Sequence, residues 1–297
     1  MTLAPETPAL SDRVVSRPRH LFRPDPVVGW TLAPGHGLRV GFRRHILQTI
    51  GADGWRHVPG AATATGPQVA LYGCSFTYGT GLSDAETFAG RLQKARPQVR
   101  IRNRGIGGHG TVQNYLQFRR DITDGAVDVA VFAIISDHRF RNIAHPQRMR
   151  QYLSPDWYRL GVEQVPVARM EASGRARIVY HPLWQPVIRD AEFDIFLPDD
   201  YMINAATLAV LDRVREAAAA AAIPLAFVLL DSLDPDFNAA VQGRFPDTRD
   251  ISTPYDAAHT FMPMDIHPNV PANRMFAERL LPVVTGLCAA LPAGGAA

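Results

Sequence analysis

The feature that most constrains the fold is the alternation of apolar runs with helical patterns between residues 67 and 135. The run from Val127 to Ile135 is apolar almost throughout, as expected for a central strand of a parallel sheet covered on both faces. Two strands and two helices are expected before it, at 69–72, 84–94, 99–102 and 111–122. This strand–helix order predicts an open, doubly wound α/β sheet.

Ser75 occupies a conspicuous position in this pattern. The first strand ends at Gly73, and the chain continues Gly73-Cys74-Ser75-Phe76-Thr77-Tyr78-Gly79. A capping box, Ser83-Asp84-Ala85-Glu86, then predicts the start of a helix. Ser75 is therefore expected at the carboxyl end of a strand, where open α/β sheets bind their ligands. Taken alone, the pattern also fits a polar turn residue with no chemistry.

The size and composition suit one α/β domain with accessory pieces. The chain has 297 residues, of which 46% are hydrophobic and 20% charged. We expect an N-terminal arm and β-rich preface at 1–66, with the arm itself at 1–26, and a main domain at 67–297. The preface is expected to contain short strands at 27–30, 38–42 and 46–50.

Charge and hydropathy exclude several classes of partner. The net charge of +3 comes from arginines spread along the chain without a basic block, which argues against a nucleic-acid partner. No stretch approaches the roughly 20 apolar residues of a membrane span, and the first thirty residues lack the apolar core of a signal peptide. We therefore expect a cytoplasmic protein with no membrane partner. Two cysteines, Cys74 and Cys288, do not make a disulfide framework.

The rhythm of strands and helices is interrupted at about 138–200, which we interpret as an insertion. Within it, strands at 158–167 and 176–180 flank a turn at 171–174 and predict a hairpin. Beyond it we expect a helix capped by Asn204 and ending near Ala222, a strand at 225–230, a polar loop at 231–259 and a closing helix from Asn269.

Candidate parts of a serine active site end on the same edge of this sheet. Nucleophilic acyl transfer needs a base near the hydroxyl, a carboxylate to orient that base, and donors for the oxyanion. Asp265 and His267 lie in the last connection, just before the closing helix. Gly107-Gly108 follows the second strand, and Ser136 follows the third. Each could face the turn that carries Ser75.

The motifs at these positions resemble those of the SGNH (GDSL-type) hydrolase family. The first matches Gly73-Cys74-Ser75-Phe76-Thr77-Tyr78-Gly79, the second Asn103-Arg104-Gly105-Ile106-Gly107-Gly108, and the last Asp265-Ile266-His267-Pro268-Asn269. The stretch from Asp25 to Gly35 also resembles a leader that precedes the first motif in some bacterial members. The resemblance covers most of the chain except 1–20 and 138–200.

This resemblance implies a three-layer α/β/α, flavodoxin-like fold and a serine hydrolase of the esterase or deacetylase type. The substrate would be a small-molecule or glycan ester, and no cofactor or metal is implied. Ser75 would be the nucleophile, His267 the general base and Asp265 its orienter. The backbone amides of Ser75 and Gly108 would bind the oxyanion, with Ser136 as a third donor.

Three positions depart from the family pattern. Cys74 stands where the family has an aspartate, and Ser136 stands where it has an oxyanion-binding asparagine. One residue separates Asp265 from His267, where many members have two. Losing one oxyanion donor costs about 2.7–4 kcal/mol in the barrier, so a catalytically silent binding protein remains an alternative.

An O-acyltransferase with the same triad is a further alternative. Other site classes are disfavoured: the histidines at 109, 138, 145 and 181 lack metal-ligand spacing, and the glycines at 105–110 do not keep the dinucleotide-binding spacing. The acyl group, the alcohol and the oligomeric state are not specified by the sequence.

Overall fold

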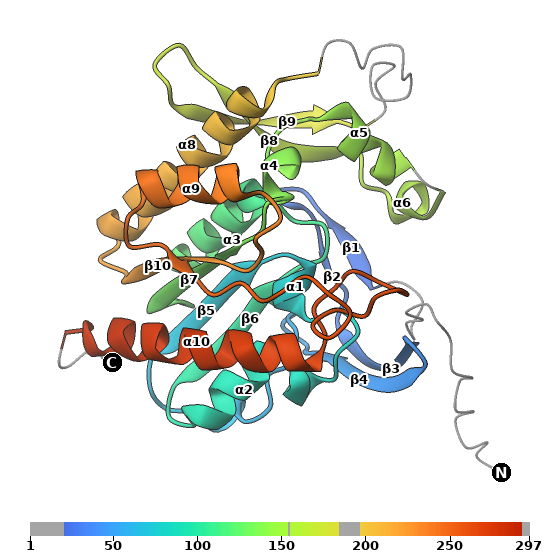
Figure 1. Cartoon of the computed structure of the whole chain (residues 1–297), viewed down its shortest axis with the longest axis vertical. Coiled ribbons are helices and arrows are strands. Elements are labelled where there is room, and N and C mark those ends of the chain that lie inside the picture. Colours follow the sequence, from blue (N-terminus) through green and yellow to red (C-terminus); the bar gives the residue numbers. More distant parts are fainter. Residues whose placement is uncertain (1–20, 154, 184–196, 293–297) are drawn as a thin grey trace.

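A computed structural model describes residues 21–153, 155–183 and 197–292. Its centre is a five-stranded parallel sheet with the spatial order β11-β10-β7-β5-β6 (Figure 1). The strands are β5 (Gln68–Gly73), β6 (Arg100–Gly105), β7 (Val129–Ile134), β10 (Leu225–Leu229) and β11 (Arg249–Asp250). Counted along the chain, this order is the 2-1-3-4-5 arrangement of flavodoxin-like folds. The predicted α/β fold class is confirmed.

Helices cover both faces of the sheet, as a three-layer fold requires (Figure 1). One face packs against α2 (Phe88–Ala95) and α10 (Val270–Ala289). The other packs against α3 (Thr111–Thr123), α8 (Asp200–Ala220) and α9 (Pro235–Arg244). Neighbouring strand residues serve opposite layers: Leu71 belongs to the first core and Tyr72 to the second. All six residues of β7 are buried, which explains why its sequence is continuously apolar.

The helix predicted at 84–94 is divided into two pieces. A short 3-10 helix, η2 (Asp84–Glu86), carries the predicted capping box between Ser83 and Glu86. The chain then becomes extended at Thr87, whose hydroxyl oxygen accepts the Gly90 N–H and starts α2 with a cap of its own. The capping box was therefore predicted correctly, but the helix was not continuous, because two N-caps follow one another.

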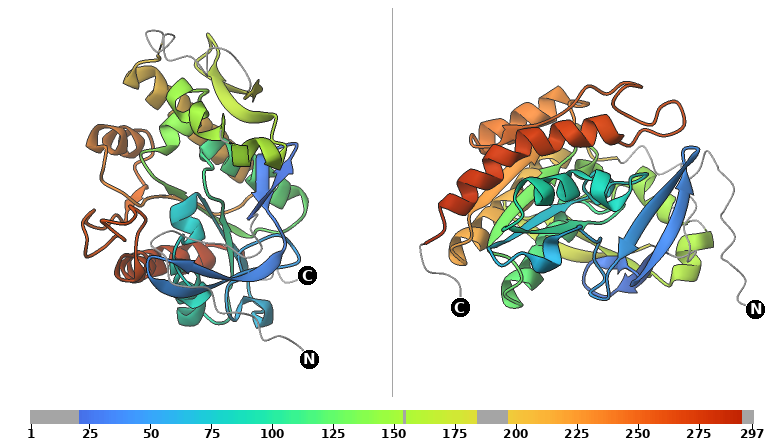
Figure 2. Two further views of the ribbon diagram at one scale, coloured as in Figure 1. Left: turned by 90° about the vertical axis from the view of Figure 1, so that its right-hand side faces the viewer. Right: turned by 90° about the horizontal axis from the view of Figure 1, so that it is seen from below.

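The N-terminal preface consists of two hairpins that are separate from the central sheet. The four strands are β1 (Phe22–Asp25), β2 (Gly29–Leu32), β3 (Gly35–Gly41) and β4 (Arg44–Ile50), followed by η1 (Ala61–Thr63). Figure 2 shows these strands, in blue, outside the central sheet. Residues 22–25 were expected in a loose arm and instead pair with β2; the arm at 1–20 lies outside the described residues. The domain division at residue 66 stays a prediction.

The insertion contains the predicted hairpin, preceded by short helices. These elements are α4 (His138–Arg141), α5 (Pro146–Met149), η3 (Arg150–Leu153), α6 (Pro155–Leu160), β8 (Gln164–Met170) and β9 (Ala176–Pro182). Strands β8 and β9 are antiparallel around the turn at 171–175. The first strand was predicted to begin at 158, but 158–160 are helical. Residues 184–196 lie outside the described residues.

The insertion packs against the preface through a third hydrophobic cluster. Trp30 and Leu32 of β2 are fully buried there, together with Tyr152 of η3 and Val165 of β8. This cluster also contains Ile106, from the loop that follows β6. The preface and the insertion therefore meet beside the carboxyl end of the sheet, where the candidate site was expected.

Two predictions in the C-terminal half were wrong. Helix α8 begins at Asp200 rather than after Asn204, because the Asp199 carboxylate accepts the Met202 N–H and is the true N-cap. The expected polar loop at 231–259 contains α9, which is capped by Asp234, and β11. The closing helix was predicted correctly: Asn269 is the N-cap of α10.

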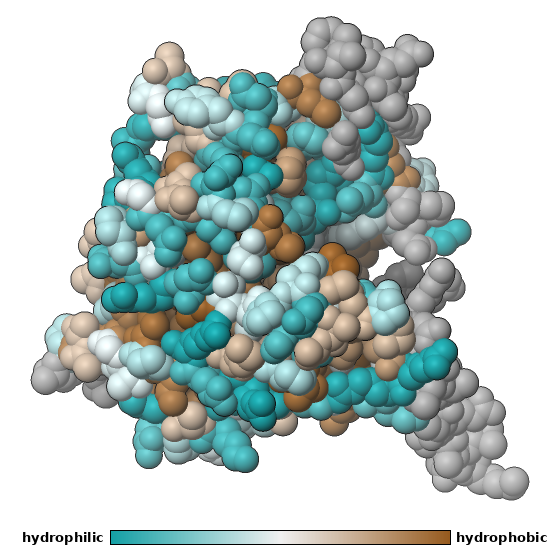
Figure 3. All heavy atoms as spheres, in the orientation of Figure 1, coloured by the Kyte–Doolittle hydropathy of each residue, from teal (hydrophilic) through white to brown (hydrophobic). Residues whose placement is uncertain are grey.

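The face with α9 and α10 is largely hydrophilic, and its hydrophobic residues appear in small patches (Figure 3). Among the described residues, no helix combines the length and apolar character needed to span a membrane. Both cysteines are free; Cys74 is buried and Cys288 is half-buried.

Candidate active site

Ser75 lies at the first position of α1 (Ser75–Tyr78), a single helical turn directly after β5. Its side chain is partly exposed. The turn is closed by Gly79, whose φ of 81° is left-handed and whose N–H donates to the Ser75 carbonyl. Within the part of the chain that the structure describes, the Ser75 hydroxyl forms no hydrogen bond. It is therefore free to meet a base or a ligand.

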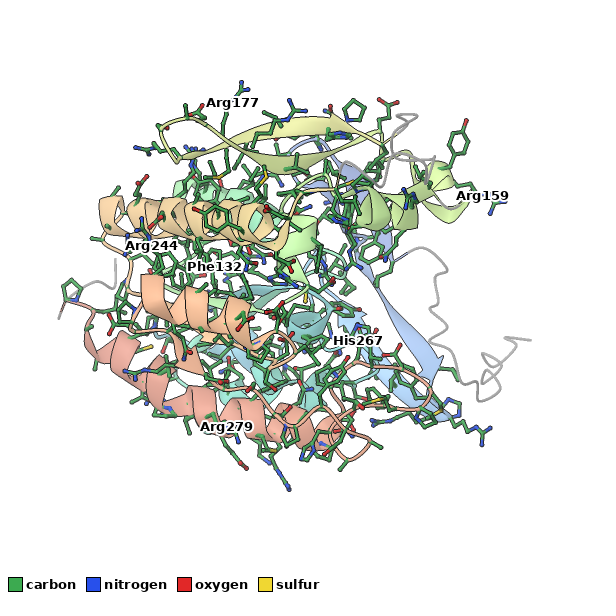
Figure 4. All side chains as sticks on the ribbon, turned by 45° about the horizontal axis from the view of Figure 1, so that its top comes forward. Phe132, Arg159, Arg177, Arg244, His267 and Arg279 are labelled. Atoms are coloured by element: carbon green, nitrogen blue, oxygen red, sulfur yellow. The ribbon has the colours of Figure 1, made fainter. Side chains whose placement is uncertain are left out.

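His267 lies in the loop that leads into α10 (Figure 4) and forms a hydrogen-bonded pair with Asp265. Nδ1 of His267 lies 2.5 Å from Oδ1 of Asp265, and the His267 backbone N–H donates to the same oxygen at 2.7 Å. A carboxylate on Nδ1 leaves Nε2 as the nitrogen that can accept a proton. Asp265 thus holds the His267 ring through Nδ1, and its role as the orienter of a general base stays a prediction.

The His267 ring packs against the turn that carries Ser75. Its centroid lies 5.7 Å from that of Phe76, with an angle of 61° between the two ring planes. Since Phe76 follows Ser75 directly, the imidazole is brought beside the candidate nucleophile. A hydrogen bond between Ser75 and His267 is not among those of the described residues. The observed contact is thus between His267 and the residue next to Ser75.

The electrostatics favour an ionised Asp265. Partial burial raises the pKa of this carboxyl, but the hydrogen bonds and the charge of His267, with two backbone N–H groups, outweigh burial and lower its pKa overall. The pKa of Tyr255 is raised mainly by burial, and the charges of Asp231, Asp265 and Asp137 raise it further.

The Gly107-Gly108 loop lies at the same end of the sheet, directly after β6. Gly108 has a φ of 84°, and a Cβ at this position would lie 3.0 Å from the Trp30 ring. The loop is held by Trp30, whose Nε1–H donates to the Gly107 carbonyl at 3.0 Å, and by Tyr152, whose hydroxyl donates to the Gly108 carbonyl at 3.3 Å. A glycine is required at 108 because the backbone is left-handed and crowded.

Two backbone donors are left unused near this turn. Over the described ranges, neither the Ser75 N–H nor the Gly108 N–H donates a hydrogen bond to another protein group. Unpaired amide donors at a ligand site are the groups that bind an oxyanion. These are the two amides that the family resemblance implied.

Ser136 occupies a different environment from a free oxyanion donor. Its hydroxyl lies 2.5 Å from Oδ1 of Asp231, and its backbone N–H donates to Oδ2 of the same carboxylate at 3.0 Å. Both residues are buried, and burial raises the pKa of Asp231 although the Ser136 bonds oppose this. The Ser136 hydroxyl is thus engaged by Asp231, and its predicted role as a third donor stays a prediction.

Sequence reasoning missed the residues that the insertion and the loop after β10 bring to this edge. Arg141 is buried, donates through Nε to Asp137 at 2.9 Å and through Nη1 to the His109 carbonyl at 2.8 Å. The four-residue spacing of Asp137 and Arg141 was a usable signal for a helical ion pair. No feature of the sequence around Asp231 predicted its hydrogen bonds with Ser136.

His109 and His138 are buried histidines with lowered pKa values. Burial lowers the pKa of His109 to about 3, and Nε2 of this residue lies 3.0 Å from the Trp30 carbonyl. Burial also lowers the pKa of His138 well below its ordinary value. Across the described residues, no group of three His, Cys, Asp or Glu side chains is placed to hold a metal ion.

No protein-family model and no curated protein matches this sequence. Similar solved structures include a lipolytic protein of the G-D-S-L family from Veillonella parvula, which is 12% identical with a TM-score of 0.43 and aligns over 73% of this chain and 98% of that one. A variant of an acetyl xylan esterase from Geobacillus stearothermophilus is 13% identical with a TM-score of 0.44, over 74% of this chain and 94% of that one.

A psychrotrophic esterase from Pseudoalteromonas is also similar, at 9% identity and a TM-score of 0.43, over 74% of this chain and 97% of that one. The Veillonella protein carries the name of the family that the motifs resemble. Identities and TM-scores this low assign no role to any residue of this chain. Roles at the site are therefore assigned from this chain's own residues.

Proposed function

We propose that this protein is a serine esterase in which Ser75 is the nucleophile, His267 the general base and Asp265 the residue that orients it. One observation carries the proposal: the His267 ring, hydrogen-bonded to Asp265 at 2.5 Å, packs on Phe76, the residue that follows Ser75. This contact supports the proposal that His267, held by Asp265, acts on the free Ser75 hydroxyl at the carboxyl end of the sheet.

The chemistry follows from these positions. The Ser75 oxygen attacks the ester carbonyl carbon while its proton passes to Nε2 of His267. Asp265 keeps the imidazole in the required tautomer and stabilises its positive charge. The alcohol leaves with the proton from His267. Water then attacks the acyl-enzyme by the same proton transfers, which releases the carboxylic acid and restores Ser75.

The oxyanion of each tetrahedral intermediate would be bound by the free amides of Ser75 and Gly108. Before the attack, the Ser75 hydroxyl and the His267 ring have to close to hydrogen-bond distance. Such contacts commonly tighten only when substrate is bound. The loop at 255–268 and the turn at 75–79 are the segments whose small adjustment would complete the contact.

The substrate class that fits is a small-molecule or glycan ester. Ser75 is partly exposed and the His267 side chain is 21% exposed, so the reacting groups are reachable from solvent. The insertion residues Arg141 and Tyr152 border the Gly108 loop. Both side chains are buried, so they fix the position of this loop and, through it, the space beside Ser75 that the ester would occupy.

Fluorophosphonate labelling and p-nitrophenyl acetate hydrolysis test the proposal on the whole chain. We expect labelling and hydrolysis in the wild type, and loss of both in Ser75→Ala and His267→Ala. His259→Ala is a matched control, because His259 contacts Asp256 in the same loop with the same pattern of bonds. Equal activity in wild type and Ser75→Ala would refute the proposal. A folded wild type that neither labels nor hydrolyses would instead identify a silent binding protein.

A further inference from the structure

A cleft of about 250 Å³ lies along the outer edge of the sheet, between β6 and the segment at 51–62. It does not include any of the candidate catalytic residues. The segment reaches the edge strand through an isolated antiparallel bridge between Arg56 and Asn103. Its volume is slightly below the range of about 300–1,000 Å³ that is common for drug-sized ligands. The cleft therefore suits a small compound.

The cleft has an unusually basic floor. Arg100, Arg102 and Arg104 alternate along β6, and residues two apart in a strand point to the same face. Burial lowers the pKa of Arg102, and the neighbouring charges of Arg104 and Arg100 lower it further. Three guanidinium groups side by side repel each other, so this arrangement is costly unless negative charge is supplied.

The protein supplies little of that charge to two of these arginines. Arg100 donates to the carbonyl of Ala64 at 2.8 Å, and Arg102 donates through Nε to the Gln68 side-chain oxygen at 2.7 Å. Both acceptors are neutral. Within the described ranges, neither arginine forms an ion pair, and Asp53 and Asp121 act on Arg102 only through space. The floor of the cleft thus carries excess positive charge.

Arg104 adds an unused buried donor. Its side chain is only 3% exposed, pairs with Asp121 at 2.9 Å and lies 4.2 Å from the centre of the Trp55 ring. Even so, Nη1 of Arg104 and Nε of Arg100 are buried and have no hydrogen-bond partner among the described residues. Buried donors without acceptors cost free energy, and these two nitrogens add to the uncompensated positive charge beneath the cleft.

We propose that this cleft is a binding site for a small phosphorylated compound. Guanidinium groups match phosphate oxygens in charge and in geometry. Two arginines without a carboxylate partner fit the double negative charge of a phosphate better than the single charge of a carboxylate. Trp55 forms an apolar wall for the remainder of the ligand. The site is independent of the proposed esterase function.

Isothermal titration of the full chain at low ionic strength tests this site, with inorganic phosphate, glycerol phosphate and acetate as probes. We expect saturable binding of both phosphates, weakened by added salt, and much weaker binding of acetate. Arg102→Gln and Arg100→Gln should each weaken phosphate binding at least about tenfold, the loss expected for one charged hydrogen bond. Arg177→Gln, at the outer edge of β9 (Figure 4), should leave it unchanged.

The two variants and the control separate the possible outcomes. Thermal melting identifies a variant that has lost its fold. If Arg102→Gln or Arg100→Gln is unfolded, phosphate binding by the other variant tests the proposal. Absence of saturable phosphate binding at millimolar concentrations, acetate bound as tightly as phosphate, or equal losses in Arg177→Gln and Arg102→Gln would each overturn the proposal. Ester hydrolysis does not enter this test, so its outcome is separate from that of the proposed function.

Discussion

Replacement of Asp265 by asparagine isolates the charge of this residue from its geometry. The His267 backbone N–H and the His267 Nδ1 both contact the same oxygen, Oδ1 of Asp265. In the asparagine variant, the His267 backbone N–H favours the side-chain rotamer that puts the carbonyl oxygen at the position of Oδ1, because the amide NH₂ cannot accept a hydrogen bond. Asp265→Asn therefore keeps both contacts and removes only the negative charge that would stabilise a protonated imidazole.

The size of the effect follows from the environment of the pair. Removing a unit charge about 4 Å away costs about 1 kcal/mol in a water-like medium and about 4 kcal/mol at an effective dielectric constant of 20. The Asp265 and His267 side chains are 29% and 21% exposed, which places the pair between these limits. We expect about 2 kcal/mol, or a roughly 30-fold fall in kcat. Asp265→Ala also removes the acceptor and should lower kcat at least about tenfold further.

Steady-state hydrolysis of p-nitrophenyl acetate by the two variants, with thermal melting of each, provides the measurement. Asp256→Asn is the matched control, because Asp256 contacts His259 as Asp265 contacts His267, and it should leave kcat unchanged. If Asp265→Asn keeps kcat within about twofold of the wild type while its melting temperature is unchanged, the role assigned to Asp265 is wrong.

Three further predictions concern stability and are measured by urea denaturation. Ser136→Ala should lower the free energy of unfolding by about 1.5–3 kcal/mol, because the buried Asp231 carboxylate loses a hydrogen bond; an unchanged value would contradict that bond. Gly108→Ala should cost about 1–3 kcal/mol, since φ is 84° and the new Cβ meets the Trp30 ring; a neutral effect would mean that the loop moves freely. His109 has a folded pKa of about 3, below its unfolded value of about 6.5, so the unfolded state takes up the proton first as pH falls. The wild type should therefore lose about 2 kcal/mol more than His109→Gln between neutral pH and pH 5, and parallel pH profiles would show that His109 is not buried neutral.

The sheet was predictable because its signals are local. The apolar run of β7 and the alternation of strands and helices around it are properties of short segments, and a strand buried on both faces has no polar positions to obscure it. The cap at Asn269 was predictable because Pro-Asn directly precedes the closing helical pattern, whereas the caps at Asp199 and Asp234 were missed although each also binds an amide three residues on. Helix α9 was missed because its Pro- and Asp-rich start resembles a loop, and it is held by burying Phe237 in a core formed by distant segments.

The sequence by itself determined the fold class and the candidate roles of Ser75, Asp265 and His267, since strand ends and short motifs are written within a few residues. Only the tertiary structure decided what surrounds them. In the tertiary structure the His267 ring packs on Phe76, and the Ser136 hydroxyl is hydrogen-bonded to Asp231. One buried nitrogen of Arg104 has no hydrogen-bond partner among the described residues. These contacts join residues dozens to nearly two hundred positions apart. They depend on how the layers of the fold pack together, and contacts between residues so far apart produce no periodic pattern in the sequence.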